Sequence, residues 1–545
     1  MTIRLPKSVK ENLRFLCVEV DSQVANLQAF FLSPTTARAR RILDRSGYAY
    51  NLKARIHSAC INTLACQDKR GNDSLTLRGA ELIATDLDRI AELCRGSVKE
   101  MDYVEEFSCI QPNRYQSLLD SVRSGIKLVE PAIKANNTRQ ALQLGKLVEK
   151  MDKAYKKLLG DYVSALKKGE RTEDLTRALF VAQRVREMGD VLLRISESII
   201  SANIGQPVNY ERFFSLQSMV SELDTDDDLH VEPIAETRSG SAISGIAPAR
   251  GENDDYIAIF KDGIKSKVKE ERQGVKSWHE IYPGLAPKIL SYEKRGESAA
   301  LLIEHLSGYT FEHILVNEDA LLLKETLKQL GKTLNSVWRE TCTNEQALAG
   351  YMQQLEKRMP EVYKIHPEFI QSTQSICGQK MPSFQSLVRQ AEQLEKKLPA
   401  PFSVYIHGDF NVDNIIYDPI GNRVNFIDLH RSRYMDYVQD VSVFMVSNYR
   451  LQILDAAARE RILRAALDFY QIARRFARRK KDETFELRLA LGLARSFITS
   501  TRFILDKSLA RSMFLRARYL LGLVLSAEHV KPARFKIPLK EIFVD

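Results

Sequence analysis

The stretch of sequence that decides the fold is HGDFNVDNIIYDPIGNRVNFIDLHRSRYMDYVQD, residues 407–440. An aspartate, Asp409, stands five positions before an asparagine, Asn414, and a second aspartate, Asp428, follows the apolar run VNFI. Phosphoryl transfer needs a carboxylate that orients the attacking hydroxyl and accepts its proton. It also needs oxygen ligands that hold Mg²⁺ against the nucleotide phosphates. Asp409 suits the first task, and Asn414 and Asp428 suit the second, so the segment predicts an enzyme that phosphorylates a hydroxyl group.

The order of these residues carries a family resemblance. A loop H-G-D-x-x-x-x-N, a predicted hairpin over residues 418–422 and then I-D follow the logic of the protein-kinase catalytic loop. HGDFNVDN and FIDLHRSRYMDYVQDVS resemble the aminoglycoside phosphotransferase and choline kinase superfamily more closely, over about residues 236–525. The resemblance implies a two-lobed α+β kinase-like fold, ATP and Mg²⁺ as cofactors, and a small-molecule hydroxyl as acceptor. It also implies that His407, Asp436 and Asp440 support the catalytic loop.

The same resemblance assigns a nucleotide site upstream of the motif. Lys261, at the end of YIAIFK, matches the lysine that grips the α- and β-phosphates, and Glu271 matches its ion-pair partner, with Glu270 as the competing choice. The segment LLIEHLSG resembles the hinge that reads adenine, although a plain buried strand accounts for LLI equally well. Small residues in TRSGSAISG would let backbone N–H groups approach phosphates. The expected nucleotide-binding residues are Lys261, Glu271, Ser239, Gly240, Ser241, Glu304 and Leu306.

Short β-type runs precede the motif, and helical patterns surround it. YIAIF (256–260), PKILSYE (287–293) and AALLIEH (299–305) predict a small sheet, with a helix over residues 265–281 inserted after the first strand. From about Phe311 onward the helical periodicity returns. The predicted kinase-like domain therefore covers residues 236–545, with a sheet lobe over 236–306 and a helical lobe over 307–545.

The N-terminal part has apolar residues at helical spacing from Leu5 to about Leu216. Breaks near Pro34 and residues 68–73, 111–113, 136–138, 169–173 and 205–207 leave room for about six helices. TDLDRIAELCRGSVKEM (85–101) and QRVREMGDVLLRISESI (183–199) lie late in the two halves and indicate a duplicated three-helix unit. This arrangement resembles the PhoU family, which implies an all-α pair of three-helix bundles over residues 1–215.

Two carboxylates of this helical part form a candidate second metal site. Asp88 and Glu92 are four residues apart, so they share one helical face, and members of the resembled family can hold metal ions with such pairs. The second copy departs from the pattern, because the position four before Asp190 is Arg186. A carboxylate pair on a solvated helix face is the alternative interpretation.

Between the two parts, residues 216–235 are predicted to form an acidic linker. SELDTDDDLHVEP contains four aspartates within five residues and too little apolar surface to fold alone. A metal-binding loop is the weaker interpretation, because the glycine and terminal glutamate of a calcium loop are missing. The chain is therefore predicted to be multidomain.

Bulk properties indicate an ordinary globular protein. The 80 basic and 70 acidic residues leave a net charge of +10, which is too small for this length to indicate nucleic-acid binding. The seven cysteines show no CxxC pair, so neither a zinc site nor a disulfide framework is expected. Because no signal-peptide pattern and no apolar run of about 18 residues is present, we expect a cytoplasmic protein without a transmembrane segment.

The acceptor is not encoded in any motif, but charge restricts it. The segment from Arg495 to Arg518 is basic and poor in acid; if its arginines face the cleft, the acceptor is neutral or anionic, such as a sugar or a phosphorylated metabolite. We expect an active metabolite kinase whose helical domain regulates or localises it, with a protein partner or a homodimer as open questions. The alternatives are a catalytically silent nucleotide-binding regulator and an adaptor linked to phosphate signalling.

Overall fold

The computed structural model describes residues 5–66, 71–134, 138–204, 215, 219, 229–236, 242–248, 256–295, 298–453 and 455–543. Contacts between Cα atoms divide the chain into two compact units. One unit consists of Met1–Ala235 with Ala247–Arg250, and the other of Glu236–Ile246 with Gly251–Asp545. The predicted acidic residues Asp224 and Asp226 to Asp228 lie outside the described residues, as do Ser239, Gly240 and Ser241.

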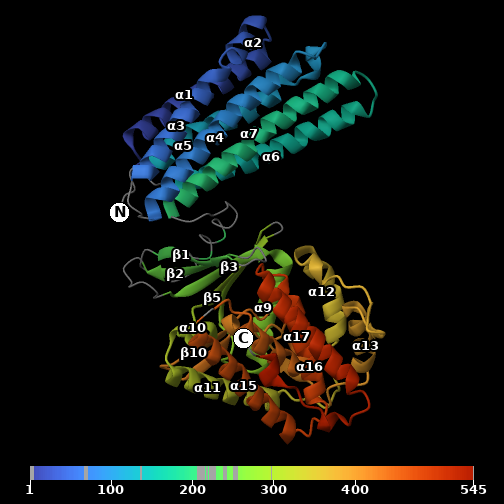
Figure 1. Cartoon of the computed structure of the whole chain (residues 1–545). Helices are drawn as coiled ribbons and strands as arrows, with labels where there is room; N and C mark the ends of the chain where they lie inside the picture. Colours follow the sequence, from blue (N-terminus) through green and yellow to red (C-terminus); the bar gives the residue numbers. More distant parts are fainter. Residues whose placement is uncertain are drawn as a thin grey trace. The chain divides into compact units, whose positions relative to one another are not determined.

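The N-terminal unit is a bundle of long helices that lie side by side (Figure 1). Among its described residues the α-helices are α1 (Lys7–Leu32), α2 (Thr36–Leu43), α3 (Ser46–Cys66), α4 (Gly71–Met101), α5 (Pro112–Lys134), α6 (Thr138–Leu166) and α7 (Thr172–Ile204). The short α2 follows the break near Pro34, and the six long helices divide at Pro112 into two sets of three, as predicted.

The helices that the sequence paired as equivalent, α4 and α7, pack directly against each other. Their buried faces carry apolar residues at helical spacing, including Leu87 and Ile90 on α4 and Leu192 on α7. Ion pairs at the edges of this contact join Glu100 to Arg184 at 3.0 Å and to Arg177 at 3.1 Å. Burial of these faces, rather than the exposed charges, supplies most of the stabilisation of such a bundle.

A five-stranded sheet of order β1-β2-β3-β5-β4 precedes the helices of the C-terminal unit, and all but the last residue of β1 fall in the segment grouped with the N-terminal unit. The strands are β1 (Leu229–Glu236), β2 (Ala242–Pro248), β3 (Ala258–Ile264), β4 (Ile289–Arg295) and β5 (Ser298–Glu304), and α9 (Lys265–Ile281) follows β3. The five central residues of β5 are buried; the strand is paired on both edges, with β3 and β4, and α9 packs on one of its faces. Sequence reasoning missed β1 and β2; β1 lies within the range predicted as linker.

Helices and short strands form the rest of this unit. The helices are α10 (Phe311–Asn317), α11 (Ala320–Glu340), α12 (Tyr351–Ile365), α13 (Phe384–Glu395), α14 (Val438–Tyr449), α15 (Ala456–Arg479), α16 (Phe485–Thr501), α17 (Lys507–Ser526) and α18 (Leu539–Ile542). The strands are β6 (Tyr309–Thr310), β7 (Gln374–Ile376), β8 (Gln379–Met381), β9 (Val404–Ile406), β10 (Ile415–Asp418), β11 (Arg423–Phe426) and β12 (Arg433–Met435).

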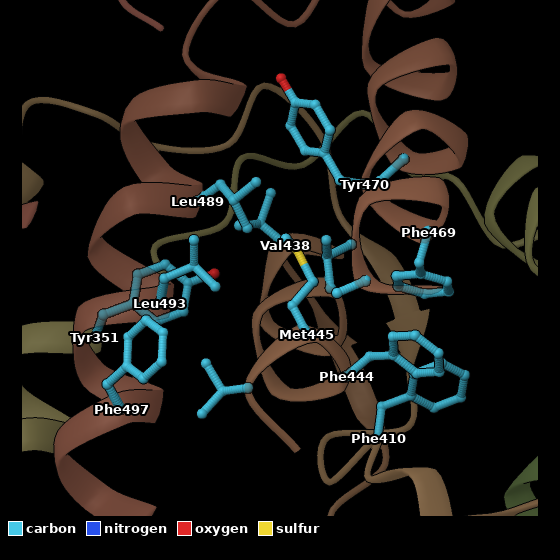
Figure 2. Close-up of a cluster of buried hydrophobic side chains, with 14 of the residues drawn as sticks. Tyr351, Phe410, Val438, Phe444, Met445, Phe469, Tyr470, Leu489, Leu493 and Phe497 are labelled. Carbon is cyan, nitrogen blue, oxygen red and sulfur yellow. The ribbon is translucent and has the colours of Figure 1, made fainter. Parts of the chain in front are cut away.

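The centre of the helical lobe is α14, all of whose residues are buried. Figure 2 shows Phe444 and Met445 of α14 among side chains of α15 and α16, with Phe444 stacked on Phe469 at 3.9 Å between ring centroids. An aromatic cluster of this kind is dense and resists deformation. We therefore expect α14 to hold its first turn, and the residues that contact this turn, in a fixed position.

The predicted fold class is confirmed in its architecture: an all-α region precedes an α+β region. The predicted hairpin joins β10 to β11, with the carboxylate of Asp418 accepting the N–H groups of Ile420 at 2.9 Å and Gly421 at 3.0 Å. Among the described residues, no helix is both long and apolar enough to cross a membrane.

Candidate active site

The segment from His407 to Asp409 leaves β9 and turns sharply at Gly408. Gly408 has φ +85°, and a Cβ at this position would lie 2.3 Å from the carbonyl oxygen of Arg431. A side chain at this position would therefore have to displace the backbone after Asp428. The turn brings two segments of the predicted motif together, one carrying Asp409 and the other carrying Asp428.

Asp440, in the first turn of α14, fastens this turn from behind. Its carboxylate accepts the backbone N–H of His407 at 2.8 Å and that of Gly408 at 2.9 Å. Gln439 donates from Nε2 to the carbonyl oxygen of Gly408 at 3.1 Å. Burial raises the pKa of Asp440 to about 7, although the two N–H donors oppose this shift. The loop that carries Asp409 is thus tied to the most buried helix of the lobe.

His407 ties the same loop to the end of β11. Its Nδ1 accepts the backbone N–H of Asp409 at 3.2 Å, which leaves Nε2 to donate to the carbonyl oxygen of Ile427 at 2.8 Å. Burial lowers the pKa of His407, in keeping with a neutral ring in this tautomer.

Asp436 lies deeper, just before α14. It forms an ion pair with Arg488 of α16, accepts a hydrogen bond from the Tyr351 hydroxyl at 3.1 Å, and caps the N–H of Val438 at 3.1 Å. Arg488 also pairs with Asp482, so one buried cation joins two buried carboxylates. Asp436 therefore positions the start of α14 rather than lining the cleft.

Asn414 and Asp428 meet through backbone contacts. Asn414 ends a 3-10 helix, Val412–Asn414, and donates from Nδ2 to the carbonyl oxygen of Asp409 at 2.9 Å, which leaves its Oδ1 to serve as a ligand. The N–H of Ile427 donates to the carbonyl oxygen of Asn414 at 3.1 Å. Asp428, the next residue, has φ +62°, an uncommon conformation that points to a functional constraint. One amide oxygen and one carboxylate suit Mg²⁺, which prefers hard oxygen ligands.

Lys261 faces the same point from the sheet. It pairs across the sheet with Leu301, whose side chain packs under α9, and so it projects toward that helix. Its Nζ lies 2.7 Å from Oδ1 of Asp428 and 3.5 Å from Oε1 of Glu271, whereas Glu270 forms no ion pair with it among the described residues. The structure thus chooses Glu271 of the two candidates. Lys261 lies within β3, not at its end as the sequence indicated.

Burial and opposite charges act against each other in this group. Burial alone would lower the pKa of Lys261, but the carboxylates of Glu271 and Asp428 outweigh it and raise the pKa. Burial dominates at Glu271 and raises the pKa of that carboxyl. At Asp428, burial would raise the pKa, but the hydrogen bond from His430 and the charge of Lys261 hold it below its ordinary value.

Sequence reasoning missed His430 and Arg431, which follow Asp428 closely. Nδ1 of His430 lies 3.4 Å from Oδ1 of Asp428 and 3.8 Å from Oε2 of Glu271. Arg431 approaches Oδ2 of Asp409 with Nη1 at 3.0 Å, and Asn411 donates to Oδ1 of Asp409 at 3.0 Å. The sequence did contain a signal for them. Both are side chains that can carry charge, and both stand just after Asp428, where the predicted strand ends.

These side chains line one cavity of about 810 Å³. Five of the predicted site residues lie on its wall: Lys261, Glu271, Asp409, Asn414 and Asp428. Glu304 ends β5 and accepts the N–H of Lys288 at 2.8 Å; neither it nor Leu306 lines the cavity. Their part in adenine binding stays a prediction.

At the candidate second metal site, both carboxylates are already paired with basic side chains. Asp88 is buried and forms an ion pair with Lys53 at 2.6 Å, and Glu92 pairs with Arg89 at 2.8 Å. Among the described residues, the group of three or more potential ligand side chains close enough to share an ion is Glu271, Asp428 and His430, and it includes neither of them. Each carboxylate already has its own cation, and metal binding there stays a prediction.

One sequence-family model matches part of the C-terminal region. The sequence model of the phosphotransferase enzyme family matches residues 276–479, a range that includes Asp409, Asn414 and Asp428 and begins after Lys261 and Glu271. The C-terminal region therefore resembles that family, as its motif predicts, and the match supports a phosphotransferase. No curated protein sequence matches the chain.

Solved structures similar to the chain fall into two groups. PhoU from Pseudomonas aeruginosa has 15% identity, with 36% of this chain and 96% of that chain covered and a TM-score of 0.34. The aminoglycoside-3'-phosphotransferase of type VIII has 14% identity, with 54% and 99% covered and a TM-score of 0.34. Plasmodium vivax ethanolamine kinase has 14% identity, with 64% and 91% covered and the same TM-score of 0.34.

Proposed function

We propose that this protein transfers the γ-phosphate of ATP, with Mg²⁺, to a hydroxyl group of a small molecule. The observation that carries the proposal is the convergence of Asp409, Asn414, Asp428 and the Lys261–Glu271 pair on one cavity from four separate segments. Little covalent chemistry is required of the protein in such a reaction, so positioning and electrostatics decide its rate.

Each residue has a role in this proposal. Asp409 accepts the proton of the attacking hydroxyl, and Arg431 orients its carboxylate. Asn414 and Asp428 would hold Mg²⁺, which when bound neutralises charge between the phosphates. Lys261 supplies positive charge to the phosphates and is held in place by Glu271.

The support residues act through the loop rather than on the substrate. Asp440 and His407 fix the backbone on both sides of Asp409, and Asp436 fixes the start of α14. We propose these as positioning residues, because none of the three lines the cavity.

Release of ADP from Mg²⁺-ATP by the full-length protein, measured across a metabolite library, tests the function. We expect Asp409→Asn to lower acceptor-dependent ADP release by about 10²-fold or more, since general-base catalysis contributes about 10²–10⁴. Asp319→Asn is the matched control, because Asp319 caps α11 and asparagine caps a helix equally well. Equal activity of the wild type and Asp409→Asn would refute the assignment.

For the rest of the chain we propose the predicted organisation. Residues 1–215 form a PhoU-like domain that regulates or localises the kinase-like domain, residues 216–235 link them, and residues 236–545 carry the chemistry in a cytoplasmic setting. In that role the helical domain would bind a protein partner or a second copy of the chain. Acceptor-independent ATP binding without ADP release, together with phosphate-dependent capture of a partner by the full-length chain, would instead support the regulator or adaptor alternative.

A further inference from the structure

One wall of the cavity is basic and lacks acid. Beyond Arg431, the charged residues on this wall are Arg450, Arg495 and Arg502, and no described lining residue after Asp428 is a carboxylate. These residues come from the end of α14, from α16 and from the turn that follows it. A polycationic acceptor would meet repulsion here without a carboxylate to bind it.

Three of the four arginines near Asp409 already have partners. Arg431 pairs with Asp409, Arg502 pairs with Glu361 at 2.7 Å, and Arg450 donates to the Asn411 side chain at 3.2 Å. Their positive charge is therefore partly used by the protein itself.

Arg495 differs from them. It is 9% exposed, and within the described residues it forms no ion pair with a carboxylate. Its Nη2 lies 3.4 Å from the Ser442 hydroxyl, its guanidinium stands 5.6 Å from the centre of the Tyr351 ring, and its Nε has no hydrogen-bond partner among the described atoms. Asp409 and Asp440 act on Arg495 through their charge but do not pair with it directly. A buried cation without a direct anionic partner is costly, so its place on a cavity wall indicates a ligand that completes it.

A second arginine on the same helix provides the comparison. Arg488, two turns earlier on α16, is 2% exposed and is paired with both Asp436 and Asp482. Among the described residues, the buried arginine that does not reach the cavity thus forms ion pairs with two carboxylates, and the one that lines the cavity forms none. This contrast argues against a purely structural role for Arg495.

We propose that the acceptor, in the function proposed above, is an anionic hydroxy compound whose phosphate or carboxylate group is bound by Arg495. A guanidinium presents parallel N–H groups that match either anion in a two-point contact. Thr499, one turn further along α16, and Arg502 line the same wall and widen the polar surface around that anion. Burial lowers the pKa of Arg495, so a bound anion would also offset that penalty.

Matched acceptors test the proposal in the full-length protein. Ribose is compared with ribose 5-phosphate, and glycerol with glycerate, by ADP release under Mg²⁺-ATP. We expect the anionic member of a pair to have the higher kcat/KM. We expect Arg495→Gln to lower that value by about 10–100-fold, the range for a hydrogen-bonded charge, while leaving the uncharged member unchanged. Arg518→Gln is the control, because Arg518 belongs to the same basic segment, binds Gln371 and does not line the cavity.

A binding measurement makes the test independent of turnover. Titration of inorganic phosphate, and separately of glycerate, into the wild type with Mg²⁺-ADP should show saturable binding that Arg495→Gln weakens about tenfold or more and Arg495→Lys weakens less. Binding of one anion and not the other identifies the group that is recognised. Circular dichroism confirms that each variant is folded.

The outcomes separate this proposal from the proposed function. Preference for an uncharged or cationic acceptor, or an absence of anion binding in the wild type, would overturn the proposal while leaving phosphotransfer intact. An equal loss for both members of each pair would assign Arg495 to the transferred phosphoryl group and overturn it as well. Anion binding lost in Arg495→Gln, with ADP release indifferent to Asp409→Asn, would instead refute the phosphotransfer and support the anion site.

Discussion

The two buried arginines of α16 are predicted to respond in opposite ways when their charge is removed. The perturbation is Arg488→Met in one variant and Arg495→Met in the other, because methionine keeps much of the length of the side chain and adapts to irregular space. Arg488 is buried between Asp436 and Asp482, whereas Arg495 is buried on the cavity wall without a carboxylate.

The magnitudes follow from what each substitution leaves behind. Arg488→Met strands two buried carboxylates, and removal of one partner from a buried ion pair costs about 3–5 kcal/mol. Arg495→Met strands none and loses only a 3.4 Å hydrogen bond and a distant ring contact. Because no buried carboxylate loses its partner and a buried cation without a direct anionic partner is itself costly, we expect between no change and a gain of about 2 kcal/mol.

Tryptophan fluorescence during urea unfolding provides the assay. The chain has two tryptophans, and both Trp278 and Trp338 are buried in the C-terminal unit, so their signal follows that unit alone. Unfolding of a chain with two units is not a single two-state transition, which makes a unit-specific probe necessary. A loss of more than about 1 kcal/mol in Arg495→Met, or of less than about 1 kcal/mol in Arg488→Met, would refute the reasoning.

Two further predictions concern backbone packing and pH. Gly274→Ala should lower both ADP release and stability of the C-terminal unit, the latter by about 1–3 kcal/mol, because its Cβ would lie 2.1 Å from the carbonyl oxygen of Leu429. Gly522→Ala, with no atom within 4 Å of its Cβ, should instead stabilise by about 0.5–1 kcal/mol, and equal effects in the two variants would contradict the packing argument. Hydrogen bonds from Arg184 hold the pKa of Glu100 below its ordinary value, so its stabilisation is present above about pH 4.3 and is lost as pH falls through the lower folded value. Circular dichroism of urea unfolding should therefore show that the difference in stability between the wild type and Glu100→Gln shrinks as the pH falls from 7 to 3. A constant difference would show that the pair does not titrate.

The sequence predicted those parts of the site whose residues lie close together along the chain. Asp409 and Asn414 belong to one loop, and a hairpin of fixed length returns the chain to Asp428, so spacing alone brought the three together. Lys261 and Glu271 were assigned from the resemblance to a known family, and their side chains meet because β3 leads directly into α9. Periodicity could not choose between Glu270 and Glu271; the choice came from the face of α9 that packs on the sheet.

The sequence could not predict which charged side chains form ion pairs in the folded protein. Arg488 and Arg495 lie on one helix and look alike in sequence, yet one meets two carboxylates and the other meets none. Asp482 lies just before α16 and is close to Arg488 in the sequence, whereas Asp436 approaches α16 only once the lobe has packed. The strands β1 and β2 were missed for a related reason, since pairing within the sheet, not their own composition, makes them strands.

The position of Asp409 and Asp428 depends on close backbone packing rather than on the two carboxylates themselves. The segment from Leu429 to Arg431 is pressed on one side by Gly274 of α9 and on the other by Gly408 of the catalytic loop, and neither site has room for a Cβ. Behind the loop, Asp440 holds two N–H groups from the rigid start of α14. A shift of α9 therefore moves Asp428 relative to Asp409, and a misplacement of about 1 Å at a reacting centre costs about 10²-fold in rate. Substitutions at Gly274 should consequently lower kcat more than they raise KM for the acceptor, whose proposed anion site on α16 lies on a different wall of the cavity.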